Sequence, residues 1–252
     1  MHRGKPVGSV SPTITNGNIM AKKDITNLDL VKVEPITDNQ KLVFDSYAEG
    51  KHQFLFGCAG TGKTFISLYL ALQEVLREDT KYDKVVMVRS LIPTREIGFL
   101  PGDEEDKAAL YQVPYQNMVK FMFKQANEQA FSMLYDRLKK QSSFYFLSTS
   151  FLRGLTFDNS IIIVDECQNL NFHELDTIVT RVGQDSKIIF CGDFMQSDLS
   201  KLSEKNGLHD FLRILEEMKE FNCIEFNIGD IVRSGFVRNY LIQKTKLGIG
   251  VE

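Results

Sequence analysis

One octapeptide, Gly57-Cys58-Ala59-Gly60-Thr61-Gly62-Lys63-Thr64, constrains the fold of this chain more than any other feature of its 252-residue sequence. It matches the phosphate-binding pattern G-x-x-x-x-G-K-(S/T) at every fixed position. The apolar run Phe54-Leu55-Phe56 precedes it, and an apolar helical pattern that begins at Phe65 follows it. Because this pattern is specific only between a strand and a helix, these flanks predict a P-loop, and a chance glycine-rich turn is the weaker alternative.

The chemistry of such a loop defines its ligands. Glycines let the backbone approach phosphates in conformations that a side chain would forbid, and the amides and the helix N-terminus then face an anion. Lys63 is expected to reach the β- and γ-phosphates, and the Thr64 hydroxyl to ligate Mg²⁺. The expected ligands of the loop are therefore ATP, or a related nucleotide, and Mg²⁺.

Strand-like apolar runs alternate with amphipathic helical stretches through the rest of the chain, which is typical of a mostly parallel α/β sheet with helices on both faces. The expected strands are Gln53–Gly57, Lys84–Ser90, Phe144–Ser148, Ser160–Asp165, Lys187–Gly192 and Cys223–Phe226. The expected helices are Asn39–Glu49, Lys63–Arg77, Glu104–Gln141 with a break near Pro114, Phe172–Val182, Asn206–Glu220 and Gly235–Leu247. Residues 1–25 have little hydrophobic pattern and are expected to form a flexible tail, which leaves residues 26–252 as a single P-loop ATPase domain.

A second chemical feature is the run Ile161-Ile162-Ile163-Val164, which ends in Asp165 and Glu166. β-Branched residues in succession suit a central parallel strand, and ligands of α/β sheets bind at the carboxyl ends of strands. Adjacent strand residues point to opposite faces, so the two acids are expected to differ in role. Asp165 would hold Mg²⁺, and Glu166 would orient and deprotonate the attacking water. A pair of acids that only stabilises a helix N-terminus is the alternative.

Polar side chains near the loop are further candidates. Gln196 follows Gly192-Asp193 at the end of a strand and is expected to touch the γ-phosphate and the water, with Gln168 as a second candidate and plain turn chemistry as the alternative. Gln40 lies upstream of the loop, and its amide can pair with an adenine edge. Helix capping by Thr37 or Asp38 is the simpler account of that segment.

Taken together, these segments resemble the PhoH-like family of ATPases from Pro35 to about Leu247. The resemblance is carried by the loop itself and by Asn39-Gln40, Ile97-Gly98-Phe99-Leu100-Pro101-Gly102, Pro114-Tyr115, Leu152-Arg153-Gly154-Leu155-Thr156-Phe157, Val164-Asp165-Glu166-Cys167-Gln168-Asn169, Thr180-Arg181-Val182-Gly183, Gly192-Asp193-x-x-Gln196 and Asp230-Ile231-Val232-Arg233. Cys58 and Cys167 stand where the family pattern leads us to expect proline and alanine.

The resemblance implies a single RecA-like core, similar to the first motor domain of superfamily 1 helicases. Some members of the family carry a fused nuclease or RNA-binding domain, and the 252 residues of this chain are expected to be too few for one. It also implies ATP hydrolysis, assembly into a ring, for which we expect a hexamer, and action on RNA. Arg153 and Thr149 are then expected to contact a nucleic-acid backbone, as is Arg95 near a neighbouring strand end. For each arginine taken alone, an ion pair with a local acid is the alternative. Arg233, or else Arg181, would complete the site of a neighbouring subunit, and the alternative for Arg233 is a salt bridge to Asp230.

Composition limits where such a protein works and how it meets nucleic acid. The formal net charge is −3, so any nucleic-acid contact must come from a local patch or an assembled pore. No apolar stretch is long enough for a membrane span, and the first residues carry no apolar signal core, so we expect a cytoplasmic protein without membrane contact.

Three functions remain open on these grounds. The first is a Mg²⁺-dependent ATPase that couples hydrolysis to remodelling or unwinding of RNA, or of single-stranded nucleic acid. The second is a regulatory ATP-binding switch that hydrolyses slowly and acts on a protein partner. The third is a small-molecule kinase, against which stands the lack of an arginine cluster typical of a lid. Stimulation of the ATPase by nucleic acid separates the first function from the second.

Overall fold

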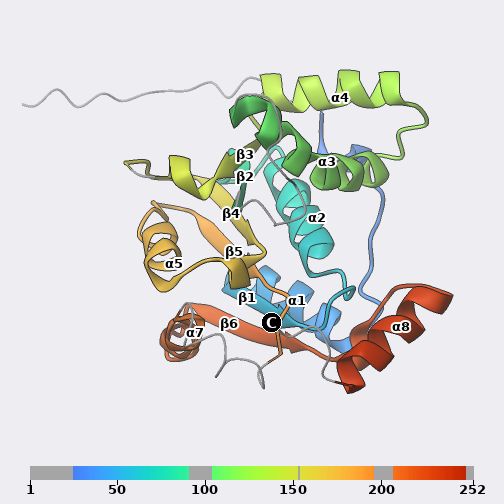
Figure 1. Ribbon diagram of the computed structural model, residues 1–252. Coiled ribbons are helices and arrows are strands. Elements are labelled where there is room, and N and C mark those ends of the chain that lie inside the picture. Colours follow the sequence, from blue (N-terminus) through green and yellow to red (C-terminus); the bar gives the residue numbers. More distant parts are fainter. Residues whose placement is uncertain (1–24, 91–103, 153, 196–206, 248–252) are drawn as a thin grey trace, which may run out of the picture.

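The computed structural model of the chain is built around one six-stranded sheet with the strand order β3-β2-β4-β5-β1-β6 (Figure 1). It describes residues 25–90, 104–152, 154–195 and 207–247. The strands are β1 His52–Gly57, β2 Lys84–Arg89, β3 Phe144–Ser148, β4 Ser160–Asp165, β5 Lys187–Cys191 and β6 Phe221–Phe226. All neighbouring strands pair in parallel, so the predicted parallel α/β sheet and its six strands are confirmed.

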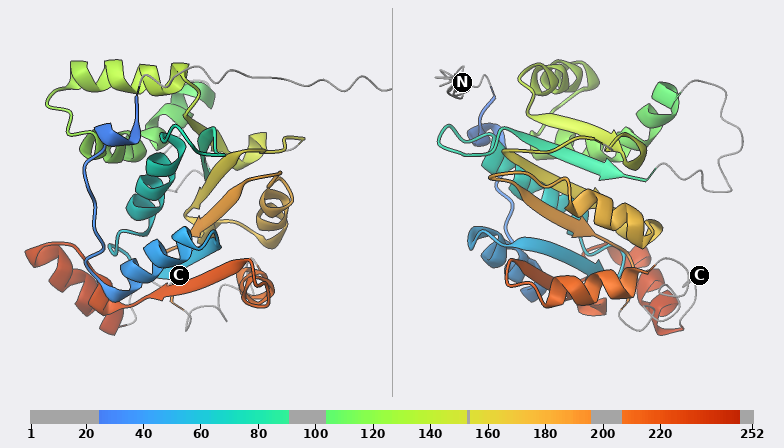
Figure 2. Two further views of the ribbon diagram at one scale, coloured as in Figure 1. Left: turned by 180° about the vertical axis from the view of Figure 1, so that it is seen from behind. Right: turned by 90° about the vertical axis from the view of Figure 1, so that its left-hand side faces the viewer.

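Helices cover both faces of the sheet, as the alternating pattern predicted (Figure 2). The helices are α1 Asp38–Ala48, α2 Lys63–Val75, α3 Glu104–Met122, α4 Glu128–Lys140, α5 Phe172–Val179, α7 Leu208–Glu216 and α8 Gly235–Lys246. Short 3-10 turns span Asn27–Asp29, Thr149–Phe151, Cys167–Asn169 and Ile228–Asp230. One core cluster joins the sheet to α1–α4 and includes Ile25, and a second joins it to α5 and α7.

One expectation about the helices was wrong. Pro114 does not break the helical stretch, because it lies inside α3, and the break falls instead between α3 and α4. Proline removes the hydrogen bond to the carbonyl four residues earlier, that of Leu110, which is an exposed residue of α3. The chain turns where Lys124 takes a φ of 50°, and the Asn127 side chain then caps α4 by accepting the N–H of Ala130.

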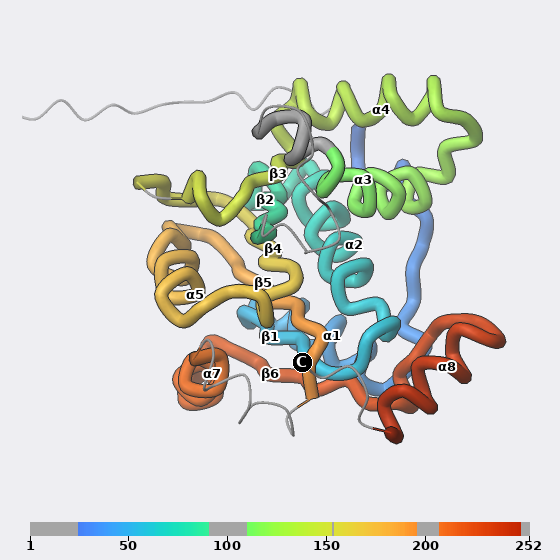
Figure 3. The backbone as a smooth tube through the Cα atoms, viewed as in Figure 1, coloured from blue at the N-terminus to red at the C-terminus, as the bar shows by residue number. Residues whose placement is uncertain are grey.

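The path of the chain brings distant segments to one edge of the sheet, as the tube in Figure 3 shows. β5 lies between β1, which leads into the glycine-rich loop, and β4, which ends in Asp165. Since all strands are parallel, the segments after β1, β4 and β5 share the carboxyl edge, where α/β sheets bind ligands. The helix α8 lies beside this edge and α7 lies at the other side of β6 (Figure 1).

Candidate nucleotide-binding site

The loop between β1 and α2 has the close backbone approaches that its glycines predict. Gly57 has a φ of 119°, and a Cβ at this position would lie 2.0 Å from the carbonyl oxygen of Phe226. Gly62 has a φ of 86° and is the N-cap of α2. Both backbone conformations are costly for any other residue, so the glycines are required by the path of the loop itself.

Lys63 is the first residue of α2, and only 4% of its side chain is exposed. Its ammonium donates to the carbonyl oxygen of Cys58 at 2.7 Å and to that of Gly57 at 3.3 Å. A carboxylate oxygen of Asp193, which follows β5, lies 2.8 Å from the same nitrogen. The cation is thus held in the mouth of the loop, and the Asp193 carboxylate is an anion that a phosphate could replace.

The two predicted metal ligands lie next to each other. The Thr64 hydroxyl donates to Oδ1 of Asp165 at 2.7 Å, although the residues are 101 positions apart. Protein oxygens of this kind suit Mg²⁺, which is usually held by one or two side chains together with substrate phosphates. The residues present therefore fit a nucleotide-bound Mg²⁺. In the described part of the chain, no group of three His, Cys, Asp or Glu side chains forms a separate metal site.

Glu166 follows Asp165 in the left-handed backbone region, with a φ of 54°, which turns its side chain away from the direction of the strand. Its carboxylate accepts a hydrogen bond from the Gln168 amide at 2.5 Å and lies 3.9 Å from the Arg89 guanidinium. Burial, followed by the charges of Asp165 and Asp193, raises the pKa of Glu166 above its ordinary value. A raised carboxyl pKa suits a group that takes a proton from water.

Gln168 connects the carboxyl ends of the neighbouring strands β4 and β5. While it donates to Glu166, its carbonyl oxygen accepts the backbone N–H of Asp193 at 3.1 Å. Of the two glutamines proposed to sense the γ-phosphate, Gln168 is therefore in contact with the acids of this edge. Gln196 lies outside the described residues.

Gln40 is buried and lies against the loop. Its amide nitrogen donates to the carbonyl of Thr61 at 3.0 Å, and its amide oxygen accepts the N–H of Ile36 at 2.9 Å. Thr37 also caps α1 by accepting the N–H of Gln40, so the simpler account of this segment is confirmed for Thr37. Pairing of Gln40 with a base stays a prediction, and its position beside the loop is compatible with it.

The two candidate arginines for a neighbouring site lie at different edges of the sheet. Arg233 packs on the loop of its own chain, because a Cβ on Gly60 would lie 3.0 Å from its Cγ. Asp230 is held by the Asn39 amide at 2.7 Å, and no ion pair joins it to Arg233 among the described residues. The carbonyl of Arg181 accepts the N–H of Phe157 at 2.9 Å, which places it at the amino edge of the sheet.

The predicted nucleic-acid contacts are described only in part. Thr149 follows β3 at the carboxyl edge and begins the 3-10 turn Thr149–Phe151, half-buried. Arg95 and Arg153 lie outside the described residues. One of the three positions is thus placed at the edge that carries the loop.

Two contributors to the site were not predicted. The hydroxyl of Tyr115, from α3, donates to Oδ2 of Asp165 at 2.7 Å, and Arg89 donates to that hydroxyl at 3.4 Å. Burial and the adjacent Asp165 raise the pKa of Tyr115 above its ordinary value, which keeps the hydroxyl a donor. Pro114-Tyr115 stood out in the sequence as part of the family resemblance, but that pattern does not indicate a contact with a carboxylate.

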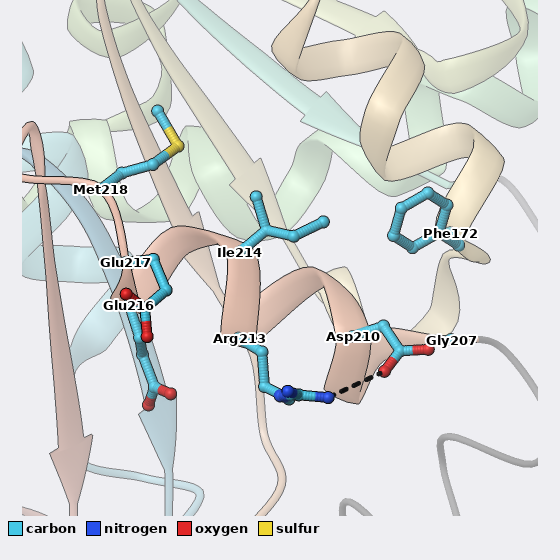
Figure 4. A pocket seen from close by; sticks show the side chains of 8 residues that line it. All are labelled: Phe172, Gly207, Asp210, Arg213, Ile214, Glu216, Glu217 and Met218. Atoms are coloured by element: carbon cyan, nitrogen blue, oxygen red, sulfur yellow. Dashed lines mark ion pairs between the residues drawn. The ribbon is translucent and has the colours of Figure 1, made fainter.

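A separate hollow lies along the outer side of α7 (Figure 4). Its lining combines the apolar Phe172 and Ile214 with the acids Asp210, Glu216 and Glu217. Arg213 lies 3.9 Å from Asp210. None of these residues contacts the loop through a described hydrogen bond or ion pair, so the hollow is not part of the candidate site.

Comparison with protein families supports the same assignment of the loop. A family model described as "PhoH-like protein" matches residues 32–243. A PhoH-like protein from Synechocystis is 33% identical over 187 residues, which are 73% of this chain and 54% of the relative. Protein PhoH from Escherichia coli K12 is 32% identical over 190 residues, covering 75% of this chain and 51% of the relative. The chain thus spans about half the length of these curated relatives.

Among solved structures, a large terminase from a thermophilic bacteriophage aligns with a TM-score of 0.49 and 13% identity, over 83% of this chain and 49% of the terminase. A DEAD box protein from Methanococcus jannaschii aligns with a TM-score of 0.40 and 14% identity, over 76% and 49%. The loop after β1, the carboxylates after β4 and the parallel sheet with β5 between them identify the fold as a RecA-like P-loop NTPase core. No helix in the described part of the chain is long and apolar enough to cross a membrane.

Proposed function

The chain belongs to the PhoH-like protein family, and from this premise we propose that it is a Mg²⁺-dependent ATPase that couples hydrolysis to remodelling or unwinding of RNA or of single-stranded nucleic acid. The observation that carries the ATPase part is the meeting of Lys63, Thr64 and Asp165 with Glu166 at one edge of the sheet. These side chains are of the kinds that phosphoryl transfer to water uses: a phosphate-binding cation, metal ligands and a base.

Each of these residues has one task in the proposed reaction. The loop amides and Lys63 bind the phosphates and stabilise the charge that develops on the transferred group. Thr64 and Asp165 would hold Mg²⁺, which neutralises phosphate oxygens when it is bound. Glu166 orients the attacking water and takes its proton, and Gln168 keeps that carboxylate in place. Gln40 is proposed to read the base and Gln196 the γ-phosphate.

The nucleic-acid part of the proposal rests on the family resemblance and on the place of Thr149 at the same edge. Contacts to a strand backbone there would involve Thr149, together with Arg95 and Arg153. Translocation along a strand needs two bodies that move against each other, and a neighbouring subunit can supply the second. We therefore propose a ring, with a hexamer as the expected form, that acts in the cytoplasm.

The deciding experiment measures the steady-state ATPase rate of the full chain alone, with single-stranded RNA and with single-stranded DNA, beside a mass determination in solution. Stimulation of several-fold by RNA supports the remodelling function. A slow rate that neither nucleic acid changes, in a protein that still binds ATP, supports the alternative, a regulatory switch that acts on a protein partner.

Arg233 gives a test of the ring. A Glu166→Gln subunit keeps its arginine and an Arg233→Ala subunit keeps its base, so mixing the two inactive variants restores activity if Arg233 serves the neighbouring site. Because Arg233 packs on Gly60 of its own chain, action within one subunit is the alternative, and it predicts no recovery on mixing. A fully active monomer would remove the ring altogether.

A further inference from the structure

We propose that Tyr115 is a positioning residue of the metal site: its hydroxyl fixes the Asp165 carboxylate so that Oδ1 faces Thr64. This inference rests on the proposed function, because it concerns how the nucleotide's Mg²⁺ would be held. It assigns a chemical task to α3, a helix that contributes none of the residues of the nucleotide loop.

The geometry around Asp165 gives each carboxylate oxygen a separate partner. Oδ1 accepts the Thr64 hydroxyl at 2.7 Å, and Oδ2 accepts the Tyr115 hydroxyl at 2.7 Å. With both oxygens engaged, rotation of the carboxylate about its terminal bond breaks at least one hydrogen bond. The oxygen on the side of the loop is thus the one available to the metal and its water shell, and Tyr115 holds the other away from it.

Tyr115 is suited to this task because it is rigid and neutral. Its side chain is 1% exposed, and its ring packs on Phe146 with centroids 5.7 Å apart. A hydroxyl donor can orient a carboxylate without cancelling its charge, whereas an arginine or lysine in contact with Asp165 would compete with Mg²⁺ for it. The carboxylate therefore keeps its charge for the metal.

Arg89 extends the same network to the catalytic acid. One guanidinium nitrogen donates to the Tyr115 hydroxyl at 3.4 Å, and another lies 3.9 Å from the Glu166 carboxylate. The guanidinium also lies 5.7 Å from the centre of the Tyr111 ring on α3. Tyr115 on α3 thus contacts Asp165, and Arg89 at the end of β2 contacts both Tyr115 and Glu166. The position of α3 therefore affects the orientation of both carboxylates.

The test is the metal dependence of nucleotide binding, measured with a fluorescent ATP analogue over a Mg²⁺ titration and again in EDTA. Tyr115→Phe keeps the ring and removes only the donor. The expected result is an Mg²⁺ requirement raised about tenfold, as for a lost hydrogen bond to a charged group, with unchanged affinity in EDTA. A residue that only fills the core would not separate these two readouts.

Tyr135→Phe is the matched control, because Tyr135 is a buried tyrosine on α4 whose ring packs on Phe131 and Phe144, away from Asp165. The Mg²⁺ requirement for nucleotide binding by Tyr135→Phe is expected to equal that of the parent protein. Arg89→Lys is the second variant, because it keeps the positive charge and loses the two-pronged guanidinium. It takes the place of Tyr115→Phe in the test if that variant does not fold. Its expected shift has the same direction and is smaller.

An Mg²⁺ requirement equal to that of the parent in the folded Tyr115→Phe variant overturns this inference and leaves the ATPase proposal standing. So does an unchanged requirement in Arg89→Lys when that variant has to decide. A parent protein that binds no nucleotide at all overturns the proposed function, and the inference with it.

Discussion

The ammonium of Lys63 and the carboxylate of Asp193 lie 2.8 Å apart and join the loop after β1 to the turn after β5. The lysine is buried, whereas 42% of the Asp193 side chain is exposed. Phosphate oxygens are the expected partners of Lys63 in a nucleotide complex, and a carboxylate in the same position must leave or share the cation. Nucleotide binding would thereby be coupled to the strand end that also contacts Gln168.

Asp193→Asn removes the anion that competes for Lys63. We expect it to bind ATP more tightly, by up to about fivefold, since a partly exposed ion pair contributes at most about 1 kcal/mol. Calorimetric titration with ATP measures the change. Asp185→Asn is the control, because Asp185 pairs with Lys81 on the surface at 3.3 Å. Weaker binding by Asp193→Asn would show that its carboxylate assists the nucleotide.

Glu166→Gln is expected to keep ATP binding and lose turnover by at least about a hundredfold, because only the general base is removed. The amide can still pair with Gln168, so the local structure should persist. Phosphate release under saturating ATP measures the rate, and Glu49→Gln on the exposed end of α1 serves as control. Parent-like turnover would show that Glu166 is not the general base.

Lys187 gives a prediction on stability that is independent of the site. Its side chain is 3% exposed, its ammonium donates to the Tyr47 carbonyl at 2.8 Å, and burial lowers its pKa from 10.5 to about 8. At pH 7 the buried Lys187 ammonium is charged, and its burial lowers the free energy of unfolding. Replacement by methionine, Lys187→Met, should therefore raise the free energy of unfolding by about 1–3 kcal/mol at that pH. The Tyr47 carbonyl keeps the N–H of Gly50 as a partner.

The sign of the pH dependence follows from the same shift. Between about pH 8 and 10.5 the folded parent has released the Lys187 proton while the unfolded chain still binds it, so the parent gains stability as the pH rises. The advantage of Lys187→Met should shrink across this window. Thermal unfolding of both proteins at several pH values measures the gap. A variant less stable than the parent at pH 7 would mean that the contacts with Tyr47 outweigh the burial cost.

The elements of this fold could be predicted from sequence wherever the signal was local. Runs such as Ile161–Val164 predict buried parallel strands, and the glycine-rich loop is defined by its own spacing. The placing of Thr64 beside Asp165 also followed, because parallel strands bring their carboxyl ends to one edge.

Contacts that depend on how a helix docks could not be predicted in this way. Tyr115 and Asp165 are 50 positions apart, and their hydrogen bond exists because α3 packs its buried side on the sheet beside β2. The end of α3 was misplaced for a similar reason. The sequence rule for Pro114 is local, whereas the actual turn at Lys124 is set by the packing of α3 and α4 on the core.

The central claim is that Lys63 and its loop bind the phosphates of ATP, and its most direct test is the binding and hydrolysis of ATP by Lys63→Ala. The unfolding temperature of the variant is compared with that of the parent, because the carbonyls of the buried Gly57 and Cys58 lose their Lys63 donor. We expect its ATP affinity or its turnover to fall by at least about a hundredfold, as for loss of a cation that meets the transferred phosphate. A well-folded Lys63→Ala protein that binds and hydrolyses ATP like the parent would contradict the account.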